Sequence, residues 1–174
     1  YYAAAKEALD KSVRLATISV TSHFSLIQLS YLMNQPADPA VVNAAVTVLS
    51  NGPMPPSVAP AFRALVDCQI FAYCKLPDAD VLRLGNAAVS NPRAIAGVTT
   101  QVAIYLAQYA IDKMGDGDLA IKISLDAMAR DPKSAALQLT AGKIYRVVGE
   151  FQRSQSHLDA AASLDSLGTY KTAI

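Results

Sequence analysis

The 174-residue sequence predicts an all-α fold, in the form of a short right-handed superhelix of antiparallel helical hairpins. Apolar residues recur at intervals of three and four rather than alternating, which is the pattern of helices with one buried face. The interruptions between apolar stretches are clusters of Pro, Gly, Asn and Asp, which end helices and form turns. The C-terminal part also resembles itself at an offset of 34 residues, as expected for stacked hairpins of equal size.

The first half of the chain contains five predicted helices, over residues 2–14, 18–33, 39–50, 57–70 and 79–90. Helix-breaking segments separate them at 34–36, 51–56, 76–78 and 91–92. Asp78 precedes the fifth helix, where its carboxylate is expected to accept hydrogen bonds from free backbone amides of the first turn. The stretch 13–33 is the most apolar, but Arg14, His23 and several Ser and Thr residues argue against a membrane span.

The second half contains four predicted helices, over residues 94–114, 118–130, 134–148 and 151–164, with turns at 115–118, 131–132 and 149–150. Ser134 is the expected N-cap of the third of these helices. The turn Gly115-Asp116-Gly117-Asp118 invites a calcium interpretation, but an EF-hand loop needs a further oxygen ligand where Ala120 stands. We therefore expect an interhelical turn at this position.

The self-similarity at 34 residues places small residues at matching positions. The offset pairs Gly115 with Gly149, Ala120 with Ser154 and Ala127 with Ala161, without a gap. Small side chains allow two helices to approach closely. Glycine after a helix allows the left-handed conformation that ends it. The pattern therefore predicts two equivalent hairpins that pack tightly.

These residues resemble the tetratricopeptide repeat, a unit of 34 residues that forms one helical hairpin. Segment 135–168 matches best, through Gly142, Tyr145, Gly149, Phe151, Ser154, Leu158 and Ala161. Segment 101–134 matches through Gly115, Ala120, Ala127 and Pro132, but Gln108 and Ile111 stand where small and aromatic residues are expected. Ser166 replaces the usual Pro. The resemblance implies two repeats within 95–168, degenerate hairpins over 1–94, and one continuous domain.

The resemblance also implies a function, which is to bind a protein or peptide in the concave groove formed by the first helix of each repeat. The residues that would line this groove are Val102, Tyr105, Tyr109, Asp112, Lys113, Ala136, Leu139, Lys143, Arg146 and Val147. Lys143 and Arg146 are three residues apart and share one helix face. The alternative is an ordinary solvated face, with the tyrosines packed against the neighbouring hairpin.

A second resemblance covers most of the chain. The stretch from Arg63 to Gln69, then Cys74, then Asp78 to Pro92, followed by two repeats, resembles the soluble tails of bacterial polytopic glycan-assembly membrane proteins of the O-antigen polymerase, ligase or glycosyltransferase type. The chain begins Tyr1-Tyr2-Ala3, and we expect it to be a piece of a longer protein. This resemblance implies an extracytoplasmic, periplasmic domain that positions partners or an acceptor; a cytoplasmic location is the alternative.

Cys68 and Cys74 are the two cysteines of the chain. On one unbroken helix their Cα atoms would be about 9 Å apart, beyond the limit of about 7 Å for a disulfide. A bridge therefore requires the helix to end near Gln69. The alternative is a pair of reduced, buried cysteines. The glycan-assembly resemblance implies an oxidising compartment, in which the bridge would form.

Charge is unevenly distributed along the chain. The total is balanced, with 15 basic and 14 acidic residues, which argues against a nucleic-acid surface. From Leu15 to Phe62, however, Asp38 is the only formally charged residue. We therefore expect this stretch to pack against another copy, the rest of the parent protein or a membrane face.

Neither an enzyme signature nor a cofactor motif is recognisable. The sequence contains no Gly-rich phosphate loop followed by Lys and no Gly-x-Ser-x-Gly elbow. His23 and His157 are far from the cysteines, and no pair of residues has zinc-ligand spacing. We expect both histidines to be structural or solvated, and the chain to have no metal, no cofactor and no catalytic activity of its own.

Overall fold

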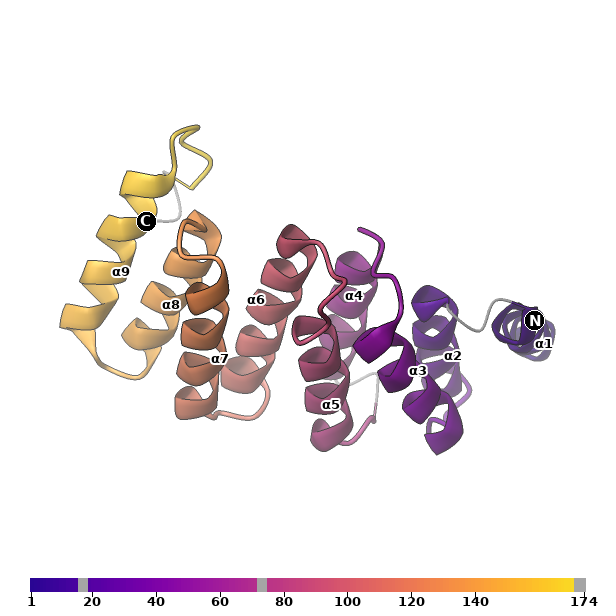
Figure 1. Ribbon diagram of the computed structural model, residues 1–174. Coiled ribbons are helices and arrows are strands. Elements are labelled where there is room, and N and C mark those ends of the chain that lie inside the picture. The colour runs from indigo at the N-terminus through magenta and orange to yellow at the C-terminus, as the bar shows by residue number, and fades with distance from the viewer. Residues whose placement is uncertain (16–18, 72–74, 171–174) are drawn as a thin grey trace. The chain divides into compact units, whose positions relative to one another are not determined.

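The computed structural model describes residues 1–15, 19–71 and 75–170 (Figure 1). The described residues form helices and no strand, which confirms the predicted all-α class. The helices are α1 (Tyr2–Leu15), α2 (Val20–Leu32), α3 (Pro39–Asn51), α4 (Val58–Ile70), α5 (Asp78–Val89), α6 (Ala96–Asp112), α7 (Gly117–Arg130), α8 (Ala135–Val147) and α9 (Phe151–Leu164). Every helix end lies within two residues of its prediction, because Pro, Gly and Asn mark the breaks.

The chain divides into two compact units, Tyr1–Val102 and Ala103–Ile174, and α6 passes from the first unit into the second. The sequence places the division eight residues earlier, between 94 and 95. That the two parts form one continuous domain stays a prediction.

In the first unit, α2 packs against α1, α3 and α4. The rings of Phe24 on α2 and Phe62 on α4 lie 6.2 Å apart between centroids and are tilted by 50°, an arrangement that aromatic pairs favour. Seven of the thirteen residues of α2 are buried. Burial within the first unit therefore explains why α2 carries no charged residue, since removing a charged side chain from water is costly. On α3, by contrast, uncharged Asn43 and Thr47 are exposed.

Asn91 joins the loop after α5 to the end of α3. Its side-chain amide is buried and donates hydrogen bonds to the carbonyls of Leu49 at 2.6 Å and Gly52 at 2.9 Å. Its Oδ1 atom accepts a hydrogen bond from the backbone N–H of Arg93 at 2.7 Å. One side chain thus satisfies backbone groups that would otherwise be unpaired.

The second unit consists of the end of α6 with α7, α8 and α9, and Figure 1 shows the last three side by side. Its core includes Ala107 and Ala110 of α6, Ala120 of α7 and Ile144 of α8. The small residues paired at 34 positions are buried as predicted; they are Ala120, Ser154, Ala127 and Ala161. Gly115 and Gly149, with φ of 68° and 84°, have the predicted left-handed conformation.

Two of the three predicted turn and cap features are confirmed. Ser134 accepts a hydrogen bond from the N–H of Leu137. Asp116 accepts one from the N–H of Leu119 at 2.9 Å, so that Gly115–Asp118 is an interhelical turn. Asp78 is not at the predicted cap position, because α5 begins at Asp78 and Pro77 occupies that position. The Asp78 carboxylate lies in the first turn, where negative charge is favourable.

The segment after α9 folds back on the last hairpin. The Asp165 carboxylate accepts hydrogen bonds from the N–H groups of Thr169 at 2.8 Å and Tyr170 at 2.6 Å. These bonds hold Tyr170 against Leu139 of α8 and Leu158 of α9. The apolar surface at this end of the hairpin is therefore covered by the chain itself.

Candidate functional site

The structure separates the ten predicted groove residues into a buried group and an accessible group. Val102 and Tyr109 have no exposed surface, and Leu139 is 7% exposed. These three side chains belong to the core, because they lie on the packed faces of α6 and α8. A partner on the surface cannot reach them, and for these residues the groove assignment is corrected.

The other seven residues are at least partly accessible. Asp112 and Lys113 at the end of α6, and Lys143, Arg146 and Val147 on α8, are exposed, while Tyr105 and Ala136 are half-buried. Helix α8 buries Ala141, Ile144 and Tyr145 on its opposite side. Its two cations therefore share one solvent-facing stripe.

A cleft in the second unit brings Asp112 and Lys143 together. Its volume is about 150 Å³, and it is lined by Gln108, Ile111, Asp112, Thr140, Lys143, Ile144 and Val147. Ligand pockets typically measure about 300–1,000 Å³. The cleft is therefore of a size for one side chain rather than a complete small molecule. Its lining combines three apolar side chains, Ile111, Ile144 and Val147, with charges of both signs.

Sequence reasoning named three of the seven cleft residues among the groove residues, Asp112, Lys143 and Val147. One of the missed residues follows from helical spacing. Gln108 lies four positions before Asp112, so the two side chains share a helix face. The α-helical period around Asp112 could have identified this neighbour.

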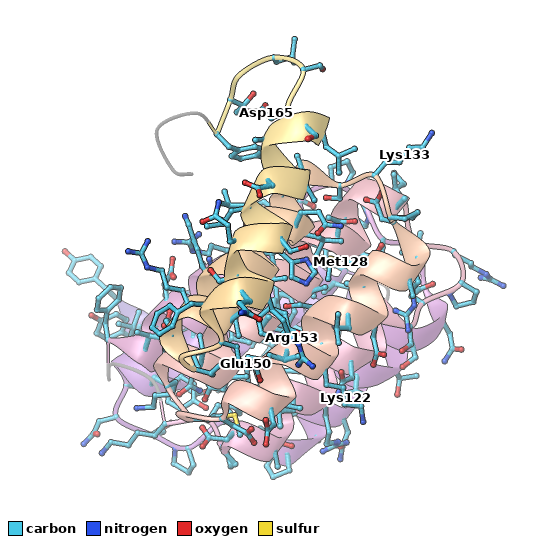
Figure 2. All side chains as sticks on the ribbon, turned by 90° about the vertical axis from the view of Figure 1, so that its left-hand side faces the viewer. Lys122, Met128, Lys133, Glu150, Arg153 and Asp165 are labelled. Carbon is cyan, nitrogen blue, oxygen red and sulfur yellow. The ribbon has the colours of Figure 1, made fainter. Side chains whose placement is uncertain are left out.

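An exposed apolar surface adjoins the cleft at the turn between α8 and α9. Val147 is 69% exposed and Phe151 is 68% exposed, and Val148 between them is partly exposed. Figure 2 shows Glu150 and Arg153 close together at the start of α9, where they form an ion pair of 2.9 Å. Exposed apolar residues gathered among charges are typical of interaction surfaces.

His157 ties α9 to α8. Its Nδ1–H donates a hydrogen bond to Oε1 of Gln138 at 2.7 Å, and its ring stacks on Tyr145 with centroids 5.2 Å apart. The Arg153 guanidinium lies 5.8 Å from the centroid of the same tyrosine ring. Burial lowers the pKa of His157 below its ordinary value, so the neutral imidazole is the form that fits here.

His23 has a similar local role in the first unit. It is buried, and its Nδ1–H donates to the backbone carbonyl of Ser19 at 2.7 Å. The Ser19 hydroxyl instead bonds to the Ser22 hydroxyl at 2.8 Å. The hydrogen bond of His23 thus stabilises the start of α2. Because it goes to the backbone carbonyl of Ser19 and not to the hydroxyl, His23 does not activate Ser19 as a nucleophile.

The predicted disulfide falls partly outside the described residues. Cys68 lies half-buried on α4, which ends at Ile70 with Phe71 as its C-cap, whereas Cys74 belongs to the segment 72–74 that the structure does not describe. The side-chain amide of Gln69 donates to the carbonyl of Leu76 at 3.3 Å, which brings the two ends of this loop together. The helix end required for a bridge is present, and the bridge itself stays a prediction.

Comparison of the chain with models of protein families, with curated proteins and with solved structures finds no match. In the described part of the chain, no helix has the length and apolar character needed to cross a bilayer. Within the same residues, His, Cys, Asp and Glu do not gather in groups of three or more that could hold a metal ion. The candidate site therefore depends on the geometry of the second unit.

Proposed function

We propose that the chain is a protein-interaction module of the tetratricopeptide-repeat type, part of a larger protein and without catalytic activity of its own. The observation that carries this proposal is the surface at the end of α8, where exposed Lys143, Arg146 and Val147 adjoin a cleft for one side chain. We refer to these three residues and the cleft as the α8 surface. With this surface, the chain can make apolar contact with a partner and pair its two cations with negative charges of that partner.

An extended peptide with one apolar and one acidic residue fits the α8 surface. The apolar side chain would enter the cleft between Ile111, Ile144 and Val147, and the carboxylate would pair with Arg146 or Lys143. An exposed ion pair contributes only about 0.2–1 kcal/mol. Apolar burial at about 25 cal/mol per Å² must therefore supply most of the affinity, and the cations would mainly set orientation and selectivity.

The matched turns and small residues of the two C-terminal hairpins support the repeat assignment. Gly115 and Gly149 end their helices in the same left-handed conformation. Ala120 and Ser154 are both buried at equivalent positions. In stacked hairpins of this kind, the first helix of every hairpin lies on the same, exposed side of the stack. In the proposed arrangement α8 is the first helix of the α8–α9 hairpin.

The alternative proposal is that the module is the extracytoplasmic domain of a bacterial glycan polymerase, ligase or glycosyltransferase, where it positions partners or the acceptor. It is favoured by the end of α4 at Ile70, which permits the Cys68–Cys74 bridge expected in an oxidising compartment. Reduced cysteines in protein purified under oxidising conditions would favour a cytoplasmic location.

The test is selection of peptides from a phage-displayed random library on the folded chain, followed by affinity measurement with the double variant Lys143→Glu/Arg146→Glu. We expect the selected peptides to contain an acidic residue near an apolar one. Their affinity should fall by about tenfold or more in the double variant, because two attractions become repulsions. The variant should keep its melting temperature, since both residues are exposed.

Lys133→Glu is the matched control. Lys133 is exposed and points outward at the end of the second unit away from Glu150 and Arg153 (Figure 2). Its reversal should leave peptide affinity unchanged. Equal binding of the selected peptides to the double variant and to the original chain would refute the proposal, and so would a selection that yields no specific peptide.

A further inference from the structure

The end of α3 contains a chemically reactive pair of residues that the proposed function does not use. Asn51 is the last residue of α3 and Gly52 is its C-cap, and this is the one place in the sequence where Gly follows Asn. In such a pair the glycine nitrogen can attack the side-chain amide carbon of the asparagine, because no side chain on the glycine hinders the approach. Proteins of heat-loving organisms contain fewer asparagines because the residue is thermolabile.

The side chain that would react is accessible to water. Asn51 is exposed, and its Nδ2 atom donates one long hydrogen bond of 3.4 Å to the carbonyl of Thr47. Water can therefore reach the amide carbon, and the ammonia that the reaction releases can leave. The side chain alone would not prevent the reaction, so the backbone conformation decides whether it occurs.

The backbone of Gly52 is held in an unreactive position. Its N–H donates a hydrogen bond of 2.7 Å to the carbonyl of Val48, and the nitrogen must lose this proton before it can attack. The attack also requires rotation about the Cα–C bond of Asn51, which would turn the Gly52 N–H away from Val48. Since Asn51 is still helical, the reaction requires the last turn of α3 to open.

Two residues of the loop after α5 oppose that opening. Nη1 of Arg93 donates a hydrogen bond of 3.1 Å to the carbonyl of Asn51. The buried side-chain amide of Asn91 donates one of 2.9 Å to the carbonyl of Gly52. These carbonyls belong to the peptide bonds before and after Gly52, so rotation at Asn51 would disturb both hydrogen bonds. The loss is greater for Asn91, because a buried amide without its partner is costly.

We propose that the Asn51–Gly52 pair is a site of spontaneous deamidation, which the folded first unit protects and which reacts when the end of α3 opens. The Gly52 nitrogen forms a bond to Cγ of Asn51, the bond from Cγ to Nδ2 breaks, and the proton of the Gly52 nitrogen completes the ammonia that leaves. Water then opens the cyclic imide at one of its carbonyls, which gives aspartate or isoaspartate at this position. Water is the co-reactant, and the site is independent of the α8 surface.

The modification would weaken the fold at the same point. Both products place a negative charge at the C-terminal end of α3, where the helix dipole disfavours it, although Arg93 would offset part of this cost. Isoaspartate also adds a carbon atom to the backbone, so that Gly52 could not keep its hydrogen bonds to Val48 and Asn91 together. A temporary opening of the first unit would thus become irreversible.

The experiment is peptide mapping by mass spectrometry of the full chain, incubated in mildly alkaline buffer at physiological temperature with and without guanidinium chloride. We expect Asn51 to be modified at least about tenfold more slowly in the folded chain than in the unfolded chain, because the rate follows the locally open fraction. Asn43 is the internal control, since it is exposed on the same helix but is followed by Ala44. It should react far more slowly than Asn51 in the unfolded chain.

Asn91→Ala tests the protection by the loop after α5. It should raise the rate in the folded chain by about tenfold, because loss of a buried hydrogen bond favours the open form. Gly142→Ala, which overpacks a contact in the second unit, should leave the rate unchanged; circular dichroism checks that both variants are folded. Equal rates in the folded and unfolded original chain, a comparison that needs no variant, would overturn the proposal. So would an unmodified Asn51 in the unfolded chain, or equal rates in the two folded variants.

Discussion

The Ser154 hydroxyl donates a hydrogen bond of 2.8 Å to the backbone carbonyl of Gly142, between two helices that pack tightly. A Cβ atom on Gly142 would lie 2.8 Å from Cδ2 of Leu158 and 3.2 Å from the carbonyl oxygen of Ser154. Because Gly142 has no side chain, α9 can approach α8 closely at this point. The Ser154 side chain is short enough to fit there and donates its hydrogen bond across the contact. The contact therefore requires a small residue at both positions.

Gly142→Ala should destabilise the chain. Overpacking costs about 1–3 kcal/mol, which exceeds the gain of somewhat under 1 kcal/mol from replacing a helical glycine by alanine. We expect a net loss of about 1 kcal/mol in the free energy of unfolding, measured by urea denaturation with circular dichroism. Gly97→Ala is the control, because no atom lies within 4 Å of its Cβ position. If Gly142→Ala is as stable as the original chain, the helices are not packed as described.

Asn91→Ala should destabilise the first unit. The substitution removes the donor for the carbonyls of Leu49 and Gly52 in a buried position, and unpaired buried groups cost about 1–3 kcal/mol. We expect a loss of about 2 kcal/mol in urea unfolding. Asn51→Ala, at an exposed position with one long hydrogen bond of 3.4 Å, should change stability by no more than about 0.5 kcal/mol. Equal losses in the two variants would contradict the role of Asn91.

His157 should make the second unit sensitive to acid. Because burial lowers its pKa from 6.5, the unfolded chain takes up the proton at a higher pH than the folded chain. The stabilising contribution is complete above pH 6.5 and is lost as the pH falls through the lowered pKa. Melting curves between pH 7.5 and 5 should show a larger decrease for the original chain than for His157→Phe, which keeps a ring on Tyr145. Parallel decreases would rule out this role.

Cys68 and Cys74 should be joined in protein purified under oxidising conditions. Intact mass should then be lower by the two thiol hydrogens, and alkylation without reductant should modify neither residue. Reduction should lower stability by about 2 kcal/mol, the value expected from the entropy of so short a loop. Cys68→Ser should reproduce this loss and should not respond to reductant. Complete alkylation of the native, unreduced protein would exclude the bridge.

The helices were predictable because their ends depend on local chemistry. Gly115 and Gly149 mark left-handed turns, and Ser134 begins α8 through its own side chain. The groove was less predictable, since Tyr109 and Leu139 have faces that could contact either a partner or a neighbouring helix. The helical period alone does not decide between these alternatives. The structure places both residues in the core.

Features that depend on distant residues were not predictable from one sequence. Asn91 bonds to carbonyls 42 and 39 residues before it, and no local pattern marks that pairing. A pocket in the first unit is likewise lined by residues far apart in the sequence, among them Tyr31 and Asn34 at the end of α2 and Lys75 before α5. Tyr31 itself has the sequence pattern of an ordinary core residue of an apolar helix.

The folded-back segment from Asp165 to Tyr170 has a consequence for any partner that approaches the last hairpin. Tyr170 occupies the apolar end of the α8–α9 hairpin, against Leu139 and Leu158. A helix or a partner protein that packs on the same two side chains must first displace Tyr170. The hydrogen bond from the Tyr170 N–H to the Asp165 carboxylate opposes that displacement, so the segment competes with any such contact.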